Sequence, residues 1–145
     1  MPTADPHNLQ RFIDAQDGQF ETALAELRAD SKQSHWMWFI FPQLAGLGRS
    51  PISQFYEITS LDEARAYLNH ALLGPRLKQA VEAVIARAGK RSAAQILGRV
   101  DAMKLRSSLT LFHQVASSDL FADALARFFD GRADERTLAL LEPTR

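Results

Sequence analysis

The sequence predicts an all-α fold, because helix caps and helically spaced apolar residues recur along almost its whole length. Serines and aspartates precede segments whose apolar residues follow one another at intervals of three and four, and glycines close several of them. No linker, repeat or low-complexity segment divides the chain. We therefore expect a single helical domain over residues 1–145, with seven or eight short helices around one core and one long ordered loop at about residues 41–58.

Composition limits the classes of function. The chain has 17 basic and 17 acidic residues, so its formal charge of zero gives no strong nucleic-acid signal and no attraction to an anionic membrane. It has no cysteine, which fits a reducing compartment and excludes thiolate metal sites. The four histidines lack metal-binding spacing, and we predict neither a metal nor a cofactor. No signal pattern or membrane-length apolar run is present, so we expect a cytoplasmic protein.

Two helices are expected before residue 30. LQRFIDAQ follows Pro6, and FETALAELRA follows Asp17 with its apolar residues on one face. The next clear start is at residue 61, where Ser60 and Glu63 have the spacing of a capping box.

The second half of the chain carries five further helical patterns. One covers about residues 74–88, and a short one, SAAQIL, begins after Ser92. Asp101 is the expected cap of DAMKLRSSLTLFHQVA. An apolar stripe follows at 120–129, and Asp134 is expected to cap the last helix.

The most unusual stretch is HWMWFIFPQ, residues 35–43, which concentrates aromatic rings before a proline. A helical turn and a short strand are both consistent with it, and its rings suit either the core or the wall of a pocket. A pocket wall is favoured by the polar groups held among them, since a buried indole N–H, histidine or amide needs a partner or water. The candidate ligand-binding residues of this stretch are His35, Trp36, Trp38 and Gln43.

AGLGRSP, residues 45–51, has two alternative interpretations. Its backbone amides and Arg49 could bind an anion, or its glycines could only permit a tight turn. The segment lacks the lysine and serine of a phosphate-binding P-loop.

A second polar concentration is DAMKLRSSLTLF, residues 101–112. Asp101, Lys104 and Ser108 share one helical face, with Ser107 adjacent. Lys104 and Ser107 or Ser108 could present donors to a polar ligand, or the hydroxyls could bond to carbonyls of their own helix. We expect HWMWFIFPQ to pack across the first two turns of this helix, so that one site is shared.

Four strings carry a resemblance to a known family: KQSHWMWFIFPQLAGLGRSPISQFYEI, SLDEARAYLNHALLGPRL, DAMKLRSSLTLF and FFDGRADERTLALL. From about Phe12 to Leu141 the chain resembles the family called domain of unknown function 1810. The resemblance implies an all-helical single domain without an established activity.

A fainter similarity lies in ILGRVDAMKLRSSLTLF, which is similar in order and spacing to NADAR domains. Those domains resemble N-glycosidases acting on ADP-ribose-type or riboflavin-pathway ribosyl substrates. The similarity implies Asp101 and Lys104 as catalytic residues and Trp38 as an aromatic platform for a base.

Two hypotheses of function follow. In the first, the protein binds a small polar or nucleotide-like ligand, with N-glycosidase-like chemistry as the enzymatic form. In the second, it is a non-catalytic interaction module or homodimer, and the aromatic stretch is core plus interface.

Overall fold

The computed structural model describes residues 5–142, and the regular secondary structure in this range is helical apart from one isolated bridge between Leu44 and Ile58. The all-α prediction is confirmed. The helices are α1 (Gln10–Gln16), α2 (Gln19–Arg28), α3 (Met37–Ile40), α4 (Pro51–Phe55), α5 (Leu61–Asn69), α6 (Leu73–Ile85), α7 (Ala93–Leu97), α8 (Arg99–His113), α9 (Leu120–Phe129) and α10 (Glu135–Leu141). None of these helices is long and apolar enough to cross a membrane.

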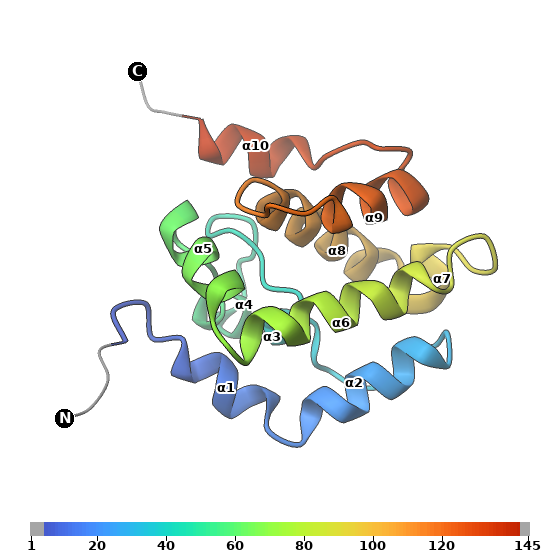
Figure 1. Ribbon diagram of the computed structural model, residues 1–145, viewed down its shortest axis with the longest axis horizontal. Helices are drawn as coiled ribbons and strands as arrows, with labels where there is room; N and C mark the ends of the chain where they lie inside the picture. Colours follow the sequence, from blue (N-terminus) through green and yellow to red (C-terminus); the bar gives the residue numbers. More distant parts are fainter. Residues whose placement is uncertain (1–4, 143–145) are drawn as a thin grey trace.

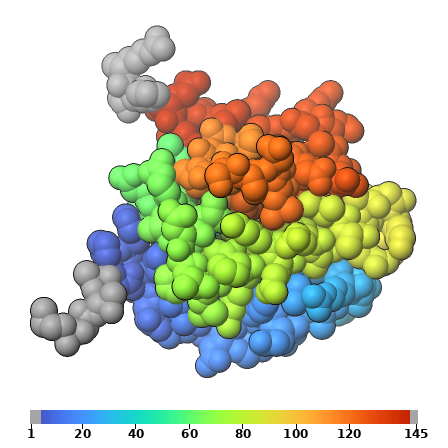
Figure 2. All heavy atoms as spheres, in the orientation of Figure 1, coloured from blue at the N-terminus to red at the C-terminus, as the bar shows by residue number. Residues whose placement is uncertain are grey.

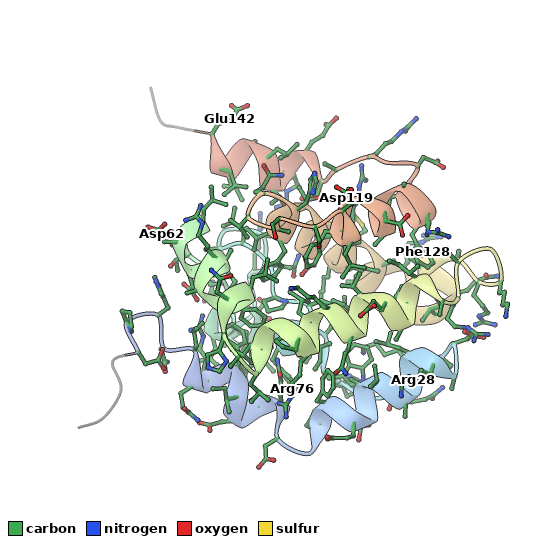
Figure 3. All side chains as sticks on the ribbon, in the orientation of Figure 1. Arg28, Asp62, Arg76, Asp119, Phe128 and Glu142 are labelled. Atoms are coloured by element: carbon green, nitrogen blue, oxygen red, sulfur yellow. The ribbon has the colours of Figure 1, made fainter. Side chains whose placement is uncertain are left out.

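Helix α6 runs through the middle of the domain, with α1 and α2 on one side and α8 and α9 on the other (Figure 1). It packs against α2, α5 and α9, while α8 packs against α5, α7, α9 and α10. On the face shown in Figure 2, α6 forms a band between the blue N-terminal helices and the orange α9 region. Arg76 of α6 lies beside the corner of α1 and α2 (Figure 3), where its guanidinium is 5.1 Å from the Phe20 ring centroid.

A chain of aromatic rings joins these layers. Phe12 of α1 meets Tyr67 of α5 edge to face with ring centroids 5.0 Å apart, and Tyr67 meets Phe112 of α8 at 5.3 Å. Phe112 in turn stacks on Phe121 of α9 at 6.0 Å. All four rings are fully buried, and each such pair adds about 0.5–1.5 kcal/mol beyond the area that it removes from water.

Several helix starts agree with the sequence. Ser92 and Gln95 form the reciprocal capping box of α7, and Asp134 accepts the Thr137 N–H at the start of α10. Both bonds satisfy backbone donors that a first helical turn leaves without partners.

Two predicted caps are wrong in detail. Ser60 does cap α5, but the Glu63 carboxylate bonds to the N–H and hydroxyl of Thr59, so the capping box is incomplete. Helix α8 begins at Arg99 after Gly98, because the positive φ of this glycine, 92°, lets the chain turn directly from α7 into α8. Asp101 therefore lies in the first turn of α8 and does not cap it.

The predicted loop at 41–58 also contains a helix. Ser50 and Pro51 start α4 inside it, and this short helix and α3 raise the number of helices in the described residues to ten. The loop closes on itself through two backbone hydrogen bonds of 2.8 Å, from Ala45 to Ile58 and from Ile58 to Gln43. The two ends of the loop are therefore fixed to each other.

The Arg11 guanidinium fastens this loop to the rest of the domain. It donates to the carbonyls of Phe55 and Glu57 and to the Glu63 carboxylate at 2.7 Å, and also to two carbonyls just before α1. The Arg11 and Glu63 side chains are only 9% and 4% exposed. One arginine thus connects α1, the loop after α4 and the first turn of α5.

Candidate functional site

A pocket of about 300 Å³ lies between the 38–53 segment, α8 and the start of α10. This volume is at the small end of the range for small-molecule sites. The pocket is lined by Trp38, Gln43, Leu47, Gly48, Arg49, Ser50, Ser53, Val100, Met103, Lys104, Ser107, Asp134 and Arg136. The aromatic stretch and the polar helix therefore meet at one concave surface, as the sequence predicted.

Helix α8 supplies one continuous strip of the pocket wall. Val100, Met103, Lys104 and Ser107 are spaced i, i+3, i+4 and i+7, which places them on one helical face. Val100 and Met103 are 68% and 61% exposed, so apolar surface borders the polar groups. The Ser107 hydroxyl donates to the Met103 carbonyl at 3.1 Å, which is the back-bonding expected of a serine inside a helix, and its oxygen can still accept a hydrogen bond.

Trp38 and Trp36 have opposite environments. Helical geometry at α3 confirms the helical interpretation of this stretch, and residues two apart on a helix point in nearly opposite directions. Trp36 is fully buried, and its indole N–H donates to Glu26 at 2.9 Å. Trp38 is partly exposed and lines the pocket.

Lys104 sits directly against the pocket tryptophan. Its Nζ lies 5.2 Å from the centroid of the Trp38 ring and 3.1 Å from Oδ1 of Asp101. The other oxygen of Asp101 is 3.0 Å from the Nζ of Lys32, which lies 5.2 Å from the Trp36 ring centroid. Asp101 is thus shared by two ammonium groups, each next to an indole, and the attraction between cation and ring face stabilises both contacts.

The loop wall brings Arg49 to the pocket, together with Gln43, Ser50 and Ser53. Ser50 caps α4 by accepting the Ser53 N–H at 3.2 Å, which fixes the orientation of the serines. A side chain at Gly48 would collide with that of Ser53, so the glycine permits the close approach of the loop to α4. The tight-turn interpretation of AGLGRSP is therefore supported, and Arg49 still lies in the pocket wall.

The start of α10 forms the third wall, and sequence reasoning did not assign it to the site. Asp134 and Arg136 line the pocket. The segment is held by Arg106, whose guanidinium donates at 2.9 Å to the carbonyls of Arg132 and Ala133. Asp134 had a detectable signal as a helix cap, but nothing local in the sequence indicates that α10 packs against α8.

Four of the residues predicted for the site lie away from the pocket lining. His35 is exposed outside it, Trp36 belongs to the core, and Ser108 is buried beneath the α8 strip. Asp101 contacts the lining residue Lys104 without lining the pocket itself. The other predicted residues, Trp38, Gln43, Arg49, Lys104 and Ser107, come together.

The polar contacts beneath the aromatic stretch are electrostatically strong. Burial acts to raise the pKa of Glu26, but hydrogen bonds from Ser34, Gln33 and Trp36 outweigh it and lower the pKa to about 2. Glu26 is therefore a permanent anion at neutral pH that holds the Trp36 indole in place. This contact fixes Trp36, the residue that precedes α3, and so fixes the start of the helix that carries Trp38.

The lining residues define what the pocket can bind. Three cationic side chains, one carboxylate, three hydroxyls and one amide surround an indole and two exposed apolar residues. Within residues 5–142, no three histidine or carboxylate side chains are grouped closely enough to hold a metal ion. The lining offers cationic donors next to apolar and aromatic surface.

Fold and site together define a class: a single-domain, all-α protein with a small cationic pocket walled by tryptophan. Residues 6–141 match the family described as "Protein of unknown function (DUF1810)", and the chain belongs to this family. It is similar to a solved crystal structure, that of the conserved hypothetical protein Rv1873 from Mycobacterium tuberculosis. The two are 47% identical with a TM-score of 0.93, over 97% of this chain and 100% of that one. A comparison with curated proteins found no match.

Proposed function

We propose that this protein binds a small anionic ligand with a planar ring, such as a nucleotide, in the pocket between α3, α8 and α10. The observation that carries the proposal is the placement of a partly exposed indole and three cationic side chains around one cavity. Ring stacking on Trp38 and ion pairing with Arg49, Lys104 and Arg136 are complementary to the two parts of such a ligand.

The positions of Asp101 and Lys104 support a role in binding more directly than one in catalysis. Both oxygens of Asp101 are engaged by lysines, so this carboxylate holds Lys104 beside Trp38. N-glycosidase-like chemistry is a second candidate, favoured by the one carboxylate in the pocket wall, that of Asp134. The N–H and hydroxyl of Thr137 both donate to Oδ2 of Asp134, so Oδ1 of this carboxylate is the oxygen that could act on a substrate. If the protein is an N-glycosidase, incubation with adenosine monophosphate will release adenine, which chromatography detects.

The interaction-module hypothesis has its own observation, the exposed apolar surface of Val100 and Met103 at the edge of the pocket. If these residues form a homodimer interface, Met103→Glu will convert a dimer to a monomer in analytical ultracentrifugation. A ligand site is favoured because charged groups surround this apolar surface, whereas the centre of a protein interface is depleted of charge.

Tryptophan fluorescence tests the binding proposal. We expect purine and pyrimidine monophosphates to quench or shift the emission, because stacking on Trp38 changes the environment of its indole. Lys104→Met should weaken the response at least about tenfold, since a charge-assisted hydrogen bond is worth about 1.5–3 kcal/mol. It should change the melting temperature only slightly, because Asp101 keeps its pair with Lys32 at 3.0 Å and is not left without a cation.

The matched control is Lys78→Met, which removes a lysine from α6 outside the pocket lining. Its titration should match that of the wild-type protein. The proposal would be refuted if no nucleotide changes the fluorescence emission of the wild-type protein and none raises its melting temperature in a parallel thermal-shift screen. An equal response from both lysine variants would place the binding outside this pocket.

A further inference from the structure

We propose that the pocket selects phosphomonoesters, whose phosphate group carries close to two negative charges at neutral pH, over phosphodiesters and other monoanions. This inference rests on the proposed function and specifies the chemical class of its ligand. It follows from the charge of the pocket wall, from the sharing of Asp101 and from the size of the cavity.

The pocket wall carries a formal charge of two positive units. Arg49, Lys104 and Arg136 contribute three positive charges, and Asp134 contributes one negative charge. Neither Arg49 nor Arg136 forms an ion pair with any residue that the structure describes. Both guanidiniums are therefore available to a ligand, and their planar arrays of donors suit phosphate oxygens.

The charge of Lys104 is not cancelled by its neighbour. Asp101 pairs with Lys104 at 3.1 Å, but it also pairs with Lys32 at 3.0 Å. The group of two ammoniums and one carboxylate keeps a net charge of one positive unit. The side chains of Lys32 and Asp101 are 10% and 17% exposed, so water screens this group less than it would a surface pair.

Charge complementarity therefore favours a dianion. A phosphomonoester has a second pKa near 6 and approaches a charge of two negative units above pH 7. Such a group neutralises the pocket wall, whereas a carboxylate or a phosphodiester leaves one positive charge unmatched. The difference appears as selectivity, because a dianion is attracted to the cationic wall more strongly than a monoanion of similar shape.

The cavity also limits the rest of the ligand. Its volume of about 300 Å³ is at the lower end for small-molecule sites, so a mononucleotide fits better than a dinucleotide. Trp38 offers a ring face, and Val100 and Met103 offer apolar surface on α8. A methionine sulfur also makes favourable contacts with aromatic rings. The ligand class is therefore a phosphomonoester with one planar ring.

Isothermal titration calorimetry with two matched ligand sets tests this inference. Each set holds one nucleoside, its 5′-monophosphate and its 3′,5′-cyclic monophosphate, one set with adenine and the other with uracil. The cyclic compound keeps the ring and the sugar but has only one negative charge. At pH 7.5 we expect the 5′-monophosphate to bind at least about tenfold more tightly than the cyclic diester.

The affinity for the monophosphate should also depend on pH. Between pH 7.5 and pH 5.0 the dianionic fraction falls about tenfold, because the second pKa of the phosphate is near 6. The affinity for the 5′-monophosphate should fall by up to that factor, while the affinity for the cyclic diester stays constant. The charged groups facing the ligand are Arg49, Lys104 and Arg136 with Asp134, and no histidine, whose charge changes in this interval, is among the pocket residues that the structure describes.

Charge-removing variants complete the test. Arg49→Gln and Arg136→Gln each remove one positive charge from the wall. Each should reduce the ratio of the affinity for the 5′-monophosphate to that for the cyclic diester at least about threefold. The control is Arg65→Gln, which removes an arginine that forms an exposed pair with Asp62 on α5, and it should leave the preference unchanged.

The outcomes separate the two proposals. Equal binding of monophosphate and cyclic diester, or a monophosphate affinity that is the same at both pH values, would overturn the inference and leave the proposed function standing. Failure of both complete sets to bind would overturn the proposed function and this inference with it.

Discussion

At the scale of single residues, two tryptophans two positions apart have different tasks. Trp36 anchors α3 in the core through its hydrogen bond to Glu26, and Trp38 faces the pocket. The acceptor is shared, because the same carboxylate also binds the N–H groups of Gln33 and Ser34. Glu26 therefore organises the whole segment that leads into α3.

This arrangement predicts a pH-dependent stability. The folded pKa of Glu26, about 2, lies below its usual value of 4.5, so its stabilisation is complete above about pH 5 and is lost as pH falls towards 2. We expect Glu26→Gln to cost about 1–3 kcal/mol at pH 7, since charge-assisted hydrogen bonds are weakened. Urea unfolding at pH 7, 5 and 3 measures the gap in free energy of unfolding between the wild-type protein and Glu26→Gln, and this gap should narrow towards pH 3. A gap that is equal at all three values would mean that the charge of Glu26 contributes nothing.

At the scale of elements, the walls of the pocket depend on contacts made far from it. The loop carrying Gln43 and Arg49 is closed by its own hydrogen bonds and fastened to α1 and α5 by Arg11. The start of α10 is held by Arg106 and by the Thr110 hydroxyl, which accepts the Asp134 N–H at 2.8 Å. Arginines outside the pocket therefore fix two of its three walls.

The Arg11 contact gives a prediction at this scale. Arg11→Met leaves the Glu63 carboxylate buried without its cation and should destabilise the domain by about 3–5 kcal/mol in urea unfolding. Arg11→Met combined with Glu63→Gln should recover part of that loss, because the unpaired charge is removed. The control Arg65→Met breaks an exposed pair and should cost at most about 1 kcal/mol. A similar small cost for Arg11→Met would show that the buried pair does not hold the loop.

At the scale of the whole molecule, the ring chain from Phe12 through Tyr67 and Phe112 to Phe121 crosses the layers of the fold. Helix α6 contacts both the N-terminal helices and α9, so no group of helices has a core of its own. This contact pattern is that of one cooperative unit.

Cooperativity can be measured directly. Thermal unfolding followed by far-ultraviolet circular dichroism and by tryptophan fluorescence should give one melting temperature. Phe112→Leu should lower both values together, by about 2–4 °C for each kcal/mol of stability lost. Separate transitions, with the fluorescence change preceding the loss of helix, would indicate that α1 to α3 unfold independently.

The fold class, most helix starts and three segments that contribute to the pocket, residues 35–43, 45–51 and 101–112, could be predicted from the sequence. These features are local: caps at Ser92 and Asp134 satisfy backbone donors of their own helices, and apolar spacing follows helical geometry. The encounter of the aromatic stretch with α8 was also predictable, because two polar and aromatic concentrations in an ordinary helical domain are best explained by one site.

Which side chains face the pocket depends on how the helices pack. The orientation of α3 directs Trp36 to Glu26 and Trp38 to Lys104, and either indole suited both roles in the sequence. Asp101 serves as a shared partner of Lys32 and Lys104 because the Lys32 N–H donates to the Ile96 carbonyl of α7 at 2.8 Å. This bond holds Lys32 beside the first turn of α8. Arg136 joins the site through packing of α10 on α8. Such contacts depend on long-range packing, whose energy is spread over many buried side chains and leaves no pattern in the neighbouring sequence.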